Sequence, residues 1–160
     1  MRVLVTGVTG MVGSCIKDLV HQYPQHEFVF TSRSSNNSSN KVELTNKTNV
    51  ESFFSFFHDK FDYIIHLAAD VGGLFKNLDK NAEMFSNNIA INENVLSMCK
   101  KYNIKRGIFV LSSCIYTPTP SKFPMDESMI HEGPPHPSNE GYAYAKRMLE
   151  LQCRQYNKAY

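Results

Sequence analysis

Three evenly spaced glycines, set between a short apolar segment and a helical pattern, limit the possible folds more than any other feature. Residues 3–5 read Val-Leu-Val, and Gly7, Gly10 and Gly13 follow before apolar residues recur at helical spacing over 16–20. A glycine directly after a strand permits a tight turn, and one inside the following helix lets that helix pack closely on a sheet. The segment therefore predicts a strand–turn–helix unit of an α/β fold.

The same alternation of apolar strands and helices continues along the chain. Further strands are expected at 28–31, 63–69 and 108–112, and helices at 50–58, at 81–102 and from Ser138 or Asn139 to Tyr160. Apolar strands without polar alternation are typical of a parallel sheet covered on both faces. We therefore expect a Rossmann-type, doubly wound α/β fold. Such folds have about six strands, so residues 1–160 are expected to form the first part of a longer protein.

Two segments are predicted to be loops, and one helix is predicted to lie in the core. Residues 32–40 are rich in Ser and Asn, which indicates a mobile surface loop, and 117–137 contain six of the seven prolines, which indicates a long loop. In the helix at 50–58, the phenylalanines are expected to form the buried face: Phe53, Phe54, Phe56 and Phe57.

Composition excludes several classes of protein. With 17 Lys and Arg against 15 Asp and Glu, the formal charge of +2 argues against a nucleic-acid or anionic-membrane partner. No apolar run approaches the ~18 residues of a membrane span, and the N-terminus does not resemble a secretory signal. Cys15, Cys99, Cys114 and Cys153 are too far apart for a zinc site or a disulfide framework. We expect a soluble, cytoplasmic protein with no metal and with reduced thiols in or near the core.

The glycine segment also has the composition of a phosphate-binding loop. Gly10 would let the backbone approach a pyrophosphate, and the N-terminus of the following helix offers N–H donors and positive dipole character. An acid after the second strand is typical of NAD sites, whereas here Arg33 follows that strand. Arg33 is placed to meet a 2′-phosphate, so NADPH or NADP is the predicted cofactor.

A second group of polar residues indicates proton-transfer chemistry. Tyr142 and Lys146 are four residues apart on a predicted helix and therefore share a face. An ammonium near a phenol is expected to lower the pKa of that phenol from its ordinary value of about 10. Ser112, at the end of the fourth predicted strand, could donate a hydrogen bond to a substrate oxygen.

With these motifs, the chain resembles the extended short-chain dehydrogenases/reductases, and within them the GDP-L-fucose synthase family. The closer resemblance is carried by residues 66–75, 112–116 and 131–148. It extends over the whole chain but over only about the N-terminal half of a family member, which implies that residues 1–160 are the NADP-binding Rossmann domain and that the C-terminal substrate domain lies outside this chain. It implies an NADPH-dependent oxidoreductase and isomerase that converts GDP-4-keto-6-deoxy-D-mannose to GDP-L-fucose by 3,5-epimerisation and 4-keto reduction. It also implies a homodimer, formed in part by the helix at 81–102 and the helix bearing Tyr142.

The resemblance implies a role for each matching residue. Ser112 would polarise the C4 carbonyl, Tyr142 would protonate its oxygen, and Lys146 would bind ribose and tune the tyrosine. Cys114 would be the base of the epimerisation, because a thiol with a pKa near 8.5 can remove protons that a neighbouring ketone acidifies. The expected cofactor-binding residues are Gly7, Thr9, Gly10, Met11, Val12, Gly13, Arg33, Leu67, Ala68, Ala69, Tyr142 and Lys146.

Some positions depart from the family pattern. The family's general-acid histidine would lie beyond residue 160, and His131 and His136 are interpreted as loop residues. Glu43 stands where the family has an aspartate after the second strand.

Two glycines and two asparagines are expected to shape the loop after the third predicted strand. Gly72 and Gly73 are expected to let backbone approach a ligand. Asn88 and Asn92 are expected to brace the loop that contains these glycines.

Two other functions remain open. A sugar-nucleotide 4-epimerase or 4,6-dehydratase keeps the superfamily but changes the reaction, and Cys114 and Arg33 argue against it. A truncated, non-catalytic module that binds NADP is the other alternative. Turnover of the ketosugar by the purified chain would distinguish the enzyme from the module.

Overall fold

The computed structural model describes residues 1–34, 40–57 and 61–160. These residues form two compact units, one of Met1–Ala69 with Ala90–Val110 and the other of Asp70–Ile89 with Leu111–Tyr160. The long helix α4 (Asn81–Lys101) contributes to both units. Residues 35–39 of the predicted mobile loop, and the end of the predicted helix at residue 58, lie outside the described residues.

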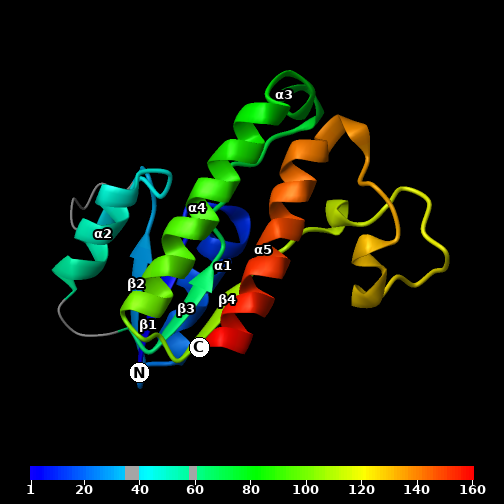
Figure 1. Cartoon of the computed structure of the whole chain (residues 1–160). Helices are drawn as coiled ribbons and strands as arrows, with labels where there is room; N and C mark the ends of the chain where they lie inside the picture. The colour runs from blue at the N-terminus through cyan, green and yellow to red at the C-terminus, as the bar shows by residue number, and fades with distance from the viewer. Residues whose placement is uncertain (35–39, 58–60) are drawn as a thin grey trace. The chain divides into compact units, whose positions relative to one another are not determined.

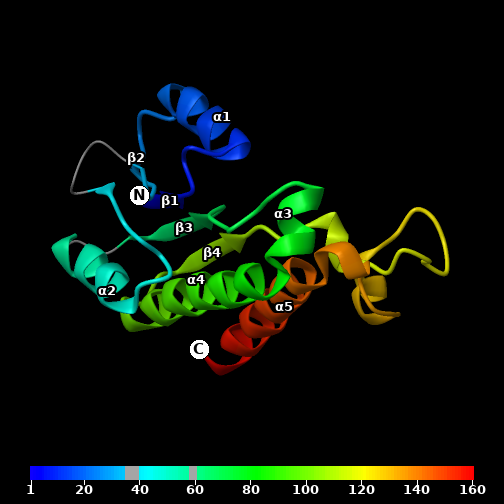
Figure 2. The same cartoon turned by 90° about the horizontal axis from the view of Figure 1, so that it is seen from above.

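The first unit contains a parallel sheet with helices on both faces. Its elements are β1 (Arg2–Thr6), α1 (Met11–Leu19), the 3-10 turn η1 (Val20–Gln22), β2 (Glu27–Thr31), α2 (Lys47–Phe56), β3 (Tyr63–His66) and β4 (Arg106–Phe109). Within the described ranges the strands form one four-stranded sheet of order β2-β1-β3-β4, with every pair parallel (Figure 1). Helix α1 lies on one face, and α2 with the C-terminal part of α4 lies on the other (Figure 2). The predicted Rossmann-type α/β fold is confirmed.

The core of this unit lies between the sheet and helices α2 and α4. Leu4 and Ile64 contribute from the central strands, and the aromatic rings of α2 pack among themselves, with the ring centroids of Phe53 and Phe57 5.0 Å apart. The buried apolar residues of this cluster are Leu4, Val29, Val42, Leu44, Val50, Phe53, Phe54, Phe61, Ile64, Ile91, Val95 and Met98. The continuous apolar character of β1 follows from its position, since it pairs on both sides and is covered on both faces.

The opposite face of the sheet becomes progressively exposed toward β4. Val5, Ile65 and Ile108 are aligned across three strands and lie on the face opposite Leu4, because successive strand residues alternate between faces. Val5 is fully buried, whereas Ile108 is 58% exposed. The fourth strand also lies earlier in the sequence than predicted, although Val110 still donates a 3.2 Å hydrogen bond to the His66 carbonyl. The predicted fourth strand is therefore present, but it spans 106–109 rather than 108–112, and one of its faces is exposed.

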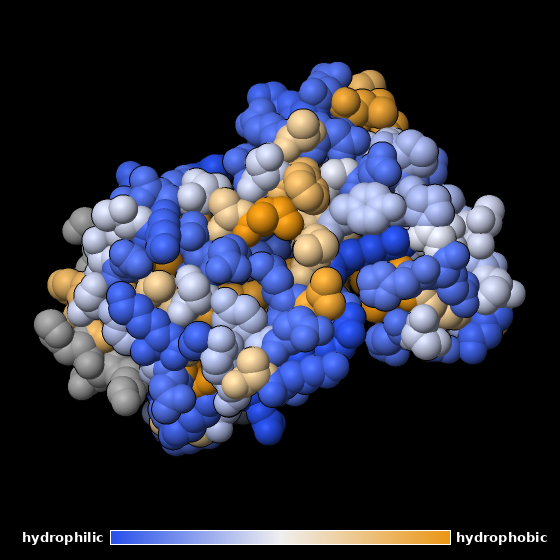
Figure 3. Space-filling model, in the orientation of Figure 1, coloured by the Kyte–Doolittle hydropathy of each residue, from blue (hydrophilic) through white to orange (hydrophobic). Residues whose placement is uncertain are grey.

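The second unit consists of helices and turns. Its elements are α3 (Leu74–Asp79), residues 81–89 of α4, the 3-10 turns η3 (Ser113–Ile115), η4 (Glu127–His131) and η5 (Pro137–Asn139), and α5 (Glu140–Ala159). Helix α3 exposes Leu74, Phe75 and Leu78, and these form an apolar group where α3 lies (Figure 3). The predicted long loop at 117–137 is thus interrupted by η4. None of the helices in the described ranges combines the length and hydropathy that crossing a bilayer requires.

Helix α5 begins at Glu140, directly after the two residues at which the sequence predicted its start. Asn139 precedes the helix without a side-chain capping bond, and Ser138 is not the cap either. Instead, His136 Nδ1 accepts a 3.2 Å hydrogen bond from the Ser138 amide at the start of η5. Gly141 fits because a Cβ there would lie 2.6 Å from Asn81 Oδ1, which accepts a hydrogen bond from the Gly141 amide.

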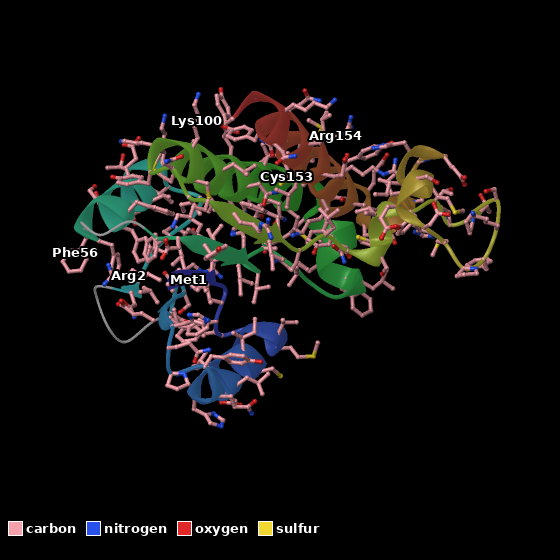
Figure 4. All side chains as sticks on the ribbon, turned by 90° about the horizontal axis from the view of Figure 1, so that it is seen from below. Met1, Arg2, Phe56, Lys100, Cys153 and Arg154 are labelled. Atoms are coloured by element: carbon pink, nitrogen blue, oxygen red, sulfur yellow. The ribbon has the colours of Figure 1, made fainter. Side chains whose placement is uncertain are left out.

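Two burial predictions were also wrong. Phe56 is 61% exposed and projects away from the sheet (Figure 4), at the last residue of α2. Cys15 is exposed on α1, while Cys99, Cys114 and Cys153 are half-buried free thiols.

Candidate active site

The glycine loop has the tight turn that the sequence predicted. Gly7 has φ 76°, a backbone conformation that residues with a side chain rarely adopt. Its amide donates a 3.0 Å hydrogen bond to the Thr31 carbonyl. A Cβ at Gly7 would lie 2.8 Å from the Ala68 nitrogen, and one at Gly13 would lie 2.6 Å from Val8 Cα. The chain's own backbone therefore requires both glycines.

Gly10 differs from the other two glycines. A Cβ there would meet only the Gly7 carbonyl oxygen, at 3.4 Å, so packing within the chain does not require a glycine. Gly10 precedes α1 without a capping side chain, and the first turn of α1 contains no acid. Met11 and Val12 are exposed at the same helix end. The backbone amides at the start of α1 and the absence of an acid in its first turn suit a phosphate group. The loop therefore fits the pyrophosphate of a dinucleotide.

A buried threonine that sequence reasoning missed holds the segment beside this loop. Thr6 Oγ1 accepts hydrogen bonds from the amides of Leu67 and Ala68, both at 3.2 Å. It also lies 2.8 Å from Nδ1 of the fully buried His66. Because the hydroxyl accepts two N–H groups, its proton is directed to His66 Nδ1. The signal in the sequence was a threonine directly before the first glycine, opposite a histidine at the end of β3.

The cation predicted for a 2′-phosphate is exposed. Arg33 is the second residue after β2 and is accessible to solvent. Lys41, which was not among the predicted residues, is also exposed. Its backbone forms an isolated parallel β-bridge with Ser32. Glu43 is engaged locally, because its Oε1 accepts a 2.8 Å hydrogen bond from the Thr45 hydroxyl. Two cations thus lie close to the end of β2.

The second unit brings together the predicted serine, cysteine, tyrosine and lysine. Tyr142 and Lys146 lie on α5, with Lys146 Nζ 5.9 Å from the centroid of the Tyr142 ring. Ser112 precedes η3, accepts a hydrogen bond from the Cys114 amide, and has its hydroxyl oxygen 3.1 Å from Cys114 Sγ. Ser112 also hydrogen-bonds the Tyr142 side chain.

Burial shifts the pKa values of Tyr142 and Lys146. The pKa of Lys146, which is 2% exposed, is lowered to about 8 by burial, while Cys114 acts in the opposite direction. Burial and Cys114 raise the pKa of Tyr142, and the hydrogen bond with Ser112 lowers it. The expected net lowering by Lys146 was wrong in direction, because the desolvation of the phenol dominates. The raised pKa keeps the phenol protonated at neutral pH, the state that a proton donor requires.

Cys114 opens onto a cavity of about 290 Å³. The cavity is lined by Ser113, Cys114, Tyr116, Thr117, Pro118, Pro120, Phe123, Met125, His136 and Asn139. His136 therefore shares a cavity with the thiol, which the sequence did not indicate. His131 does not line this cavity, and its Nε2 lies 3.5 Å from the Glu150 carboxylate.

The loop after β3 is fixed to α4 by amide hydrogen bonds. Asn88 accepts from the Asp70 amide at 2.9 Å and donates to the Asp70 carbonyl at 2.8 Å. The carboxylate of Asp70 accepts a 2.9 Å hydrogen bond from Asn87 and forms an ion pair with Lys76. The bracing role predicted for Asn88 is confirmed. It does not extend to Asn92, whose buried amide has no hydrogen-bond partner within the described residues.

Neither of the two glycines in this loop is held by close backbone contact. A Cβ at Gly72 would meet only the flexible side chain of Lys76, and one at Gly73 would meet nothing within 4 Å. An approach of a ligand to Gly72 and Gly73 stays a prediction.

Comparison with known proteins identifies the class. A model of the NAD dependent epimerase/dehydratase family matches residues 3–160, and the chain belongs to this family. Within it, the chain is similar to GDP-L-fucose synthases. It is 44% identical over 158 residues to GDP-L-fucose synthase of Dictyostelium discoideum and 40% identical over 160 residues to probable GDP-L-fucose synthase of Drosophila melanogaster. Each match covers 99% of this chain and 47% of the relative.

Solved structures agree with this relationship. The crystal structure of a GDP-L-fucose synthetase from Naegleria fowleri is 32% identical and has a TM-score of 0.84, covering 99% of this chain and 44% of that one. The same protein bound to NADP has a TM-score of 0.83. The resemblance inferred from the sequence is confirmed, and the chain spans about half the length of the curated relatives it matches.

Proposed function

We propose that this chain is the NADPH-binding part of an enzyme that converts GDP-4-keto-6-deoxy-D-mannose to GDP-L-fucose. The observation that carries the proposal is the grouping of Ser112, Cys114, Tyr142 and Lys146 in one unit, with the thiol 3.1 Å from the serine hydroxyl and open to a cavity. The similarity to GDP-L-fucose synthases supports this choice of substrate.

The thiol serves the epimerisation. Cys114, as thiolate, removes the proton from a carbon next to the C4 ketone, and the electron pair left behind is delocalised onto the ketone oxygen. The Ser112 hydroxyl stabilises that oxygen by donating a hydrogen bond. Return of a proton to the opposite face of the same carbon inverts it. The acid that returns this proton is not assigned among the residues of this chain.

The tyrosine and lysine serve the reduction. Bound NADPH supplies the hydride that reduces C4. Tyr142 gives its phenolic proton to the C4 oxygen, which becomes a hydroxyl, and Ser112 orients this oxygen for the transfer. Lys146, whose pKa is lowered to about 8, places a cation near the phenolate that results.

Binding of the cofactor rests on the glycine loop and the cations after β2. The amides at the start of α1 would hold the pyrophosphate, and Arg33 would pair with the 2′-phosphate. Leu67, Ala68 and Ala69 would line the cofactor beside Gly7, from the segment that Thr6 fixes.

Calorimetric titration of the purified chain with NADPH, and with NADH as the control, tests the cofactor assignment. We expect NADPH to bind more tightly, and Arg33→Ala to weaken NADPH roughly tenfold to a hundredfold, the loss of a charge-assisted hydrogen bond, while leaving NADH unchanged. Arg154→Ala, at an exposed arginine of α5, is the matched control and should change neither. Equal binding of both cofactors, or equal losses for both with Arg33→Ala, would contradict the assignment.

A second function is favoured by the length of the match. Because the chain covers 47% of its relatives, the 160 residues by themselves could act as a module that binds NADPH without turnover. Incubation with NADPH and the ketosugar distinguishes the two, since loss of NADPH absorbance requires the enzyme. Sedimentation analysis of the same sample tests the homodimer that the family resemblance implies.

A further inference from the structure

Arg147 is a buried cation beside the candidate catalytic lysine. It is 6% exposed, and two of its nitrogens donate 2.7 Å hydrogen bonds, Nε to the Ile115 carbonyl and Nη2 to the Gly133 carbonyl. Its guanidinium carbon lies 5.4 Å from the centroid of the Tyr144 ring. Within the described part of the chain it forms no ion pair with a carboxylate. Backbone carbonyls and an aromatic ring therefore compensate this charge.

The two carbonyls belong to segments that border the cavity. Ile115 ends η3, the turn that carries Cys114 and is preceded by Ser112. Gly133 lies in the proline-rich segment that leads to η5, and a Cβ on it would lie 3.1 Å from the Thr117 hydroxyl oxygen. Arg147 thus connects α5, the Cys114 turn and the proline-rich segment through one side chain.

This connection depends on the shape of the guanidinium group. Arginine presents several N–H donors in one rigid plane, so that one side chain can serve two carbonyls at a fixed separation. A lysine could satisfy only one of them well, and a methionine could fill the space but donate to neither. Burial of a charge without a counter-ion is costly unless its donors are used, so the contribution of Arg147 lies in the geometry that its two hydrogen bonds impose.

We propose that Arg147 is a positioning residue that holds the turn of Ser112 and Cys114 against α5, so that the thiol and Tyr142 stay in one site. Its relevance to catalysis rests on the function proposed above. Arg147 acts through Ile115 and Gly133 and is not a catalytic residue.

Site-resolved alkylation of the thiols tests this role. The intact chain is treated with iodoacetamide, and the modification of each cysteine is followed by peptide mass spectrometry. In Arg147→Met we expect the alkylation rate of Cys114 to rise roughly tenfold, the factor that ~1.4 kcal/mol represents, while the exposed Cys15 is unchanged. Arg147→Lys should give an intermediate rate. Arg154→Met, on the same helix but exposed and paired with Glu150, should match the unsubstituted chain.

Chemical rescue distinguishes a positioning role of Arg147 from a general contribution of its side chain to stability. Guanidinium, at concentrations far below those that unfold proteins, should enter the space left in Arg147→Met and slow the alkylation of Cys114 again. Urea at the same concentration has a similar shape but no charge and should not do so.

Three results would overturn the proposal. They are an unchanged Cys114 rate in a folded Arg147→Met chain, a parallel rise at all four cysteines, and equal effects of guanidinium and urea. If Arg147→Met does not fold, Arg147→Lys decides, since a Cys114 rate equal to that of the unsubstituted chain would then overturn it. The assay needs neither NADPH nor sugar, so its failure is distinct from failure of the proposed function.

Discussion

At the scale of single residues, the burial of Lys146 has the largest energetic consequence in the candidate active site. Its ammonium is 2% exposed, and burial lowers its pKa from 10.5 to about 8. A pKa that is lower in the folded than in the unfolded state means that the protonated form is destabilised by folding. The shift corresponds to about 3 kcal/mol at pH 7.

This cost predicts a dependence of stability on pH. Between pH 8 and 10.5 the unfolded chain binds more protons at Lys146 than the folded chain, so the free energy of unfolding rises with pH in this window. Lys146→Met removes the cost, and we expect it to stabilise the chain by about 3 kcal/mol at pH 7. Its advantage over the unsubstituted chain should shrink steadily as the pH approaches 10.5.

Urea unfolding of both chains at a series of pH values measures this difference. Other groups that titrate in the same range are common to both chains, so they cancel. Lys158→Met, at an exposed lysine of the same helix, is the control and should show no pH-dependent advantage. A constant difference between Lys146→Met and the unsubstituted chain would contradict the burial of a charged Lys146.

At the scale of elements, the loop between β1 and α1 contains two glycines that the fold requires and one that it does not. Gly7 and Gly13 are held by contacts within the chain, since a Cβ at either would enter neighbouring backbone. Gly10 has room for a Cβ in the chain itself and lies at the uncapped start of α1. The three glycines look equivalent in the sequence, and only their neighbours in space distinguish them.

Alanine at Gly13 should therefore affect stability, whereas alanine at Gly10 should affect cofactor binding. Gly13→Ala is expected to destabilise the chain by ~1–3 kcal/mol, because the new methyl group enters the backbone of Val8. Gly10→Ala is expected to change stability by less than ~0.5 kcal/mol but to weaken NADPH binding, because its methyl group projects where the phosphates would lie. Thermal unfolding and calorimetry on the same samples measure both quantities. Loss of stability in Gly10→Ala, or tight NADPH binding by it, would show that this division is wrong.

At the scale of the whole chain, β4 presents an unusual surface. Among the residues that the structure describes, β3 is its only partner strand, and Ile108 and Val110 are 58% and 42% exposed on the same face. An apolar strand at the edge of a sheet is a template for pairing with another chain. Two features limit this tendency: β4 has only four residues, and Arg106, two residues before Ile108, places one exposed charge on the same face.

This surface predicts self-association of the purified 160-residue chain. Ile108→Lys places a charge on the exposed face of β4 and should lower light scattering at high protein concentration. Leu78→Lys, at a leucine 55% exposed on helix α3, is the matched control. We expect it to have a smaller effect, because a helix presents no unpaired backbone edge. Equal effects of the two substitutions would indicate general apolar association rather than an effect of the strand.

The sequence by itself determined the parallel α/β fold and the tight glycine turn after β1, and it named Ser112, Cys114, Tyr142 and Lys146 as the candidate catalytic set. Those features depend on local rules, namely strand runs without polar alternation, glycine at sterically restricted turns and residues four apart on one helix face. Residue spacing alone therefore predicts the fold, the turn and the pairing of Tyr142 with Lys146, whereas the role of Cys114 rests on the family resemblance.

Only the tertiary structure decided the direction in which the pKa of Tyr142 is shifted and the placement of His136 in the cavity of Cys114. It also decided the exposure of Phe56 and Ile108 and the two hydrogen bonds of Arg147. Each depends on neighbours that are distant in the sequence, such as Ile115, which lies 32 residues before Arg147. Desolvation is a property of the surrounding packing rather than of the residue itself. The spacing of Tyr142 and Lys146 thus predicted that they would meet, and only the packing around them determined their protonation.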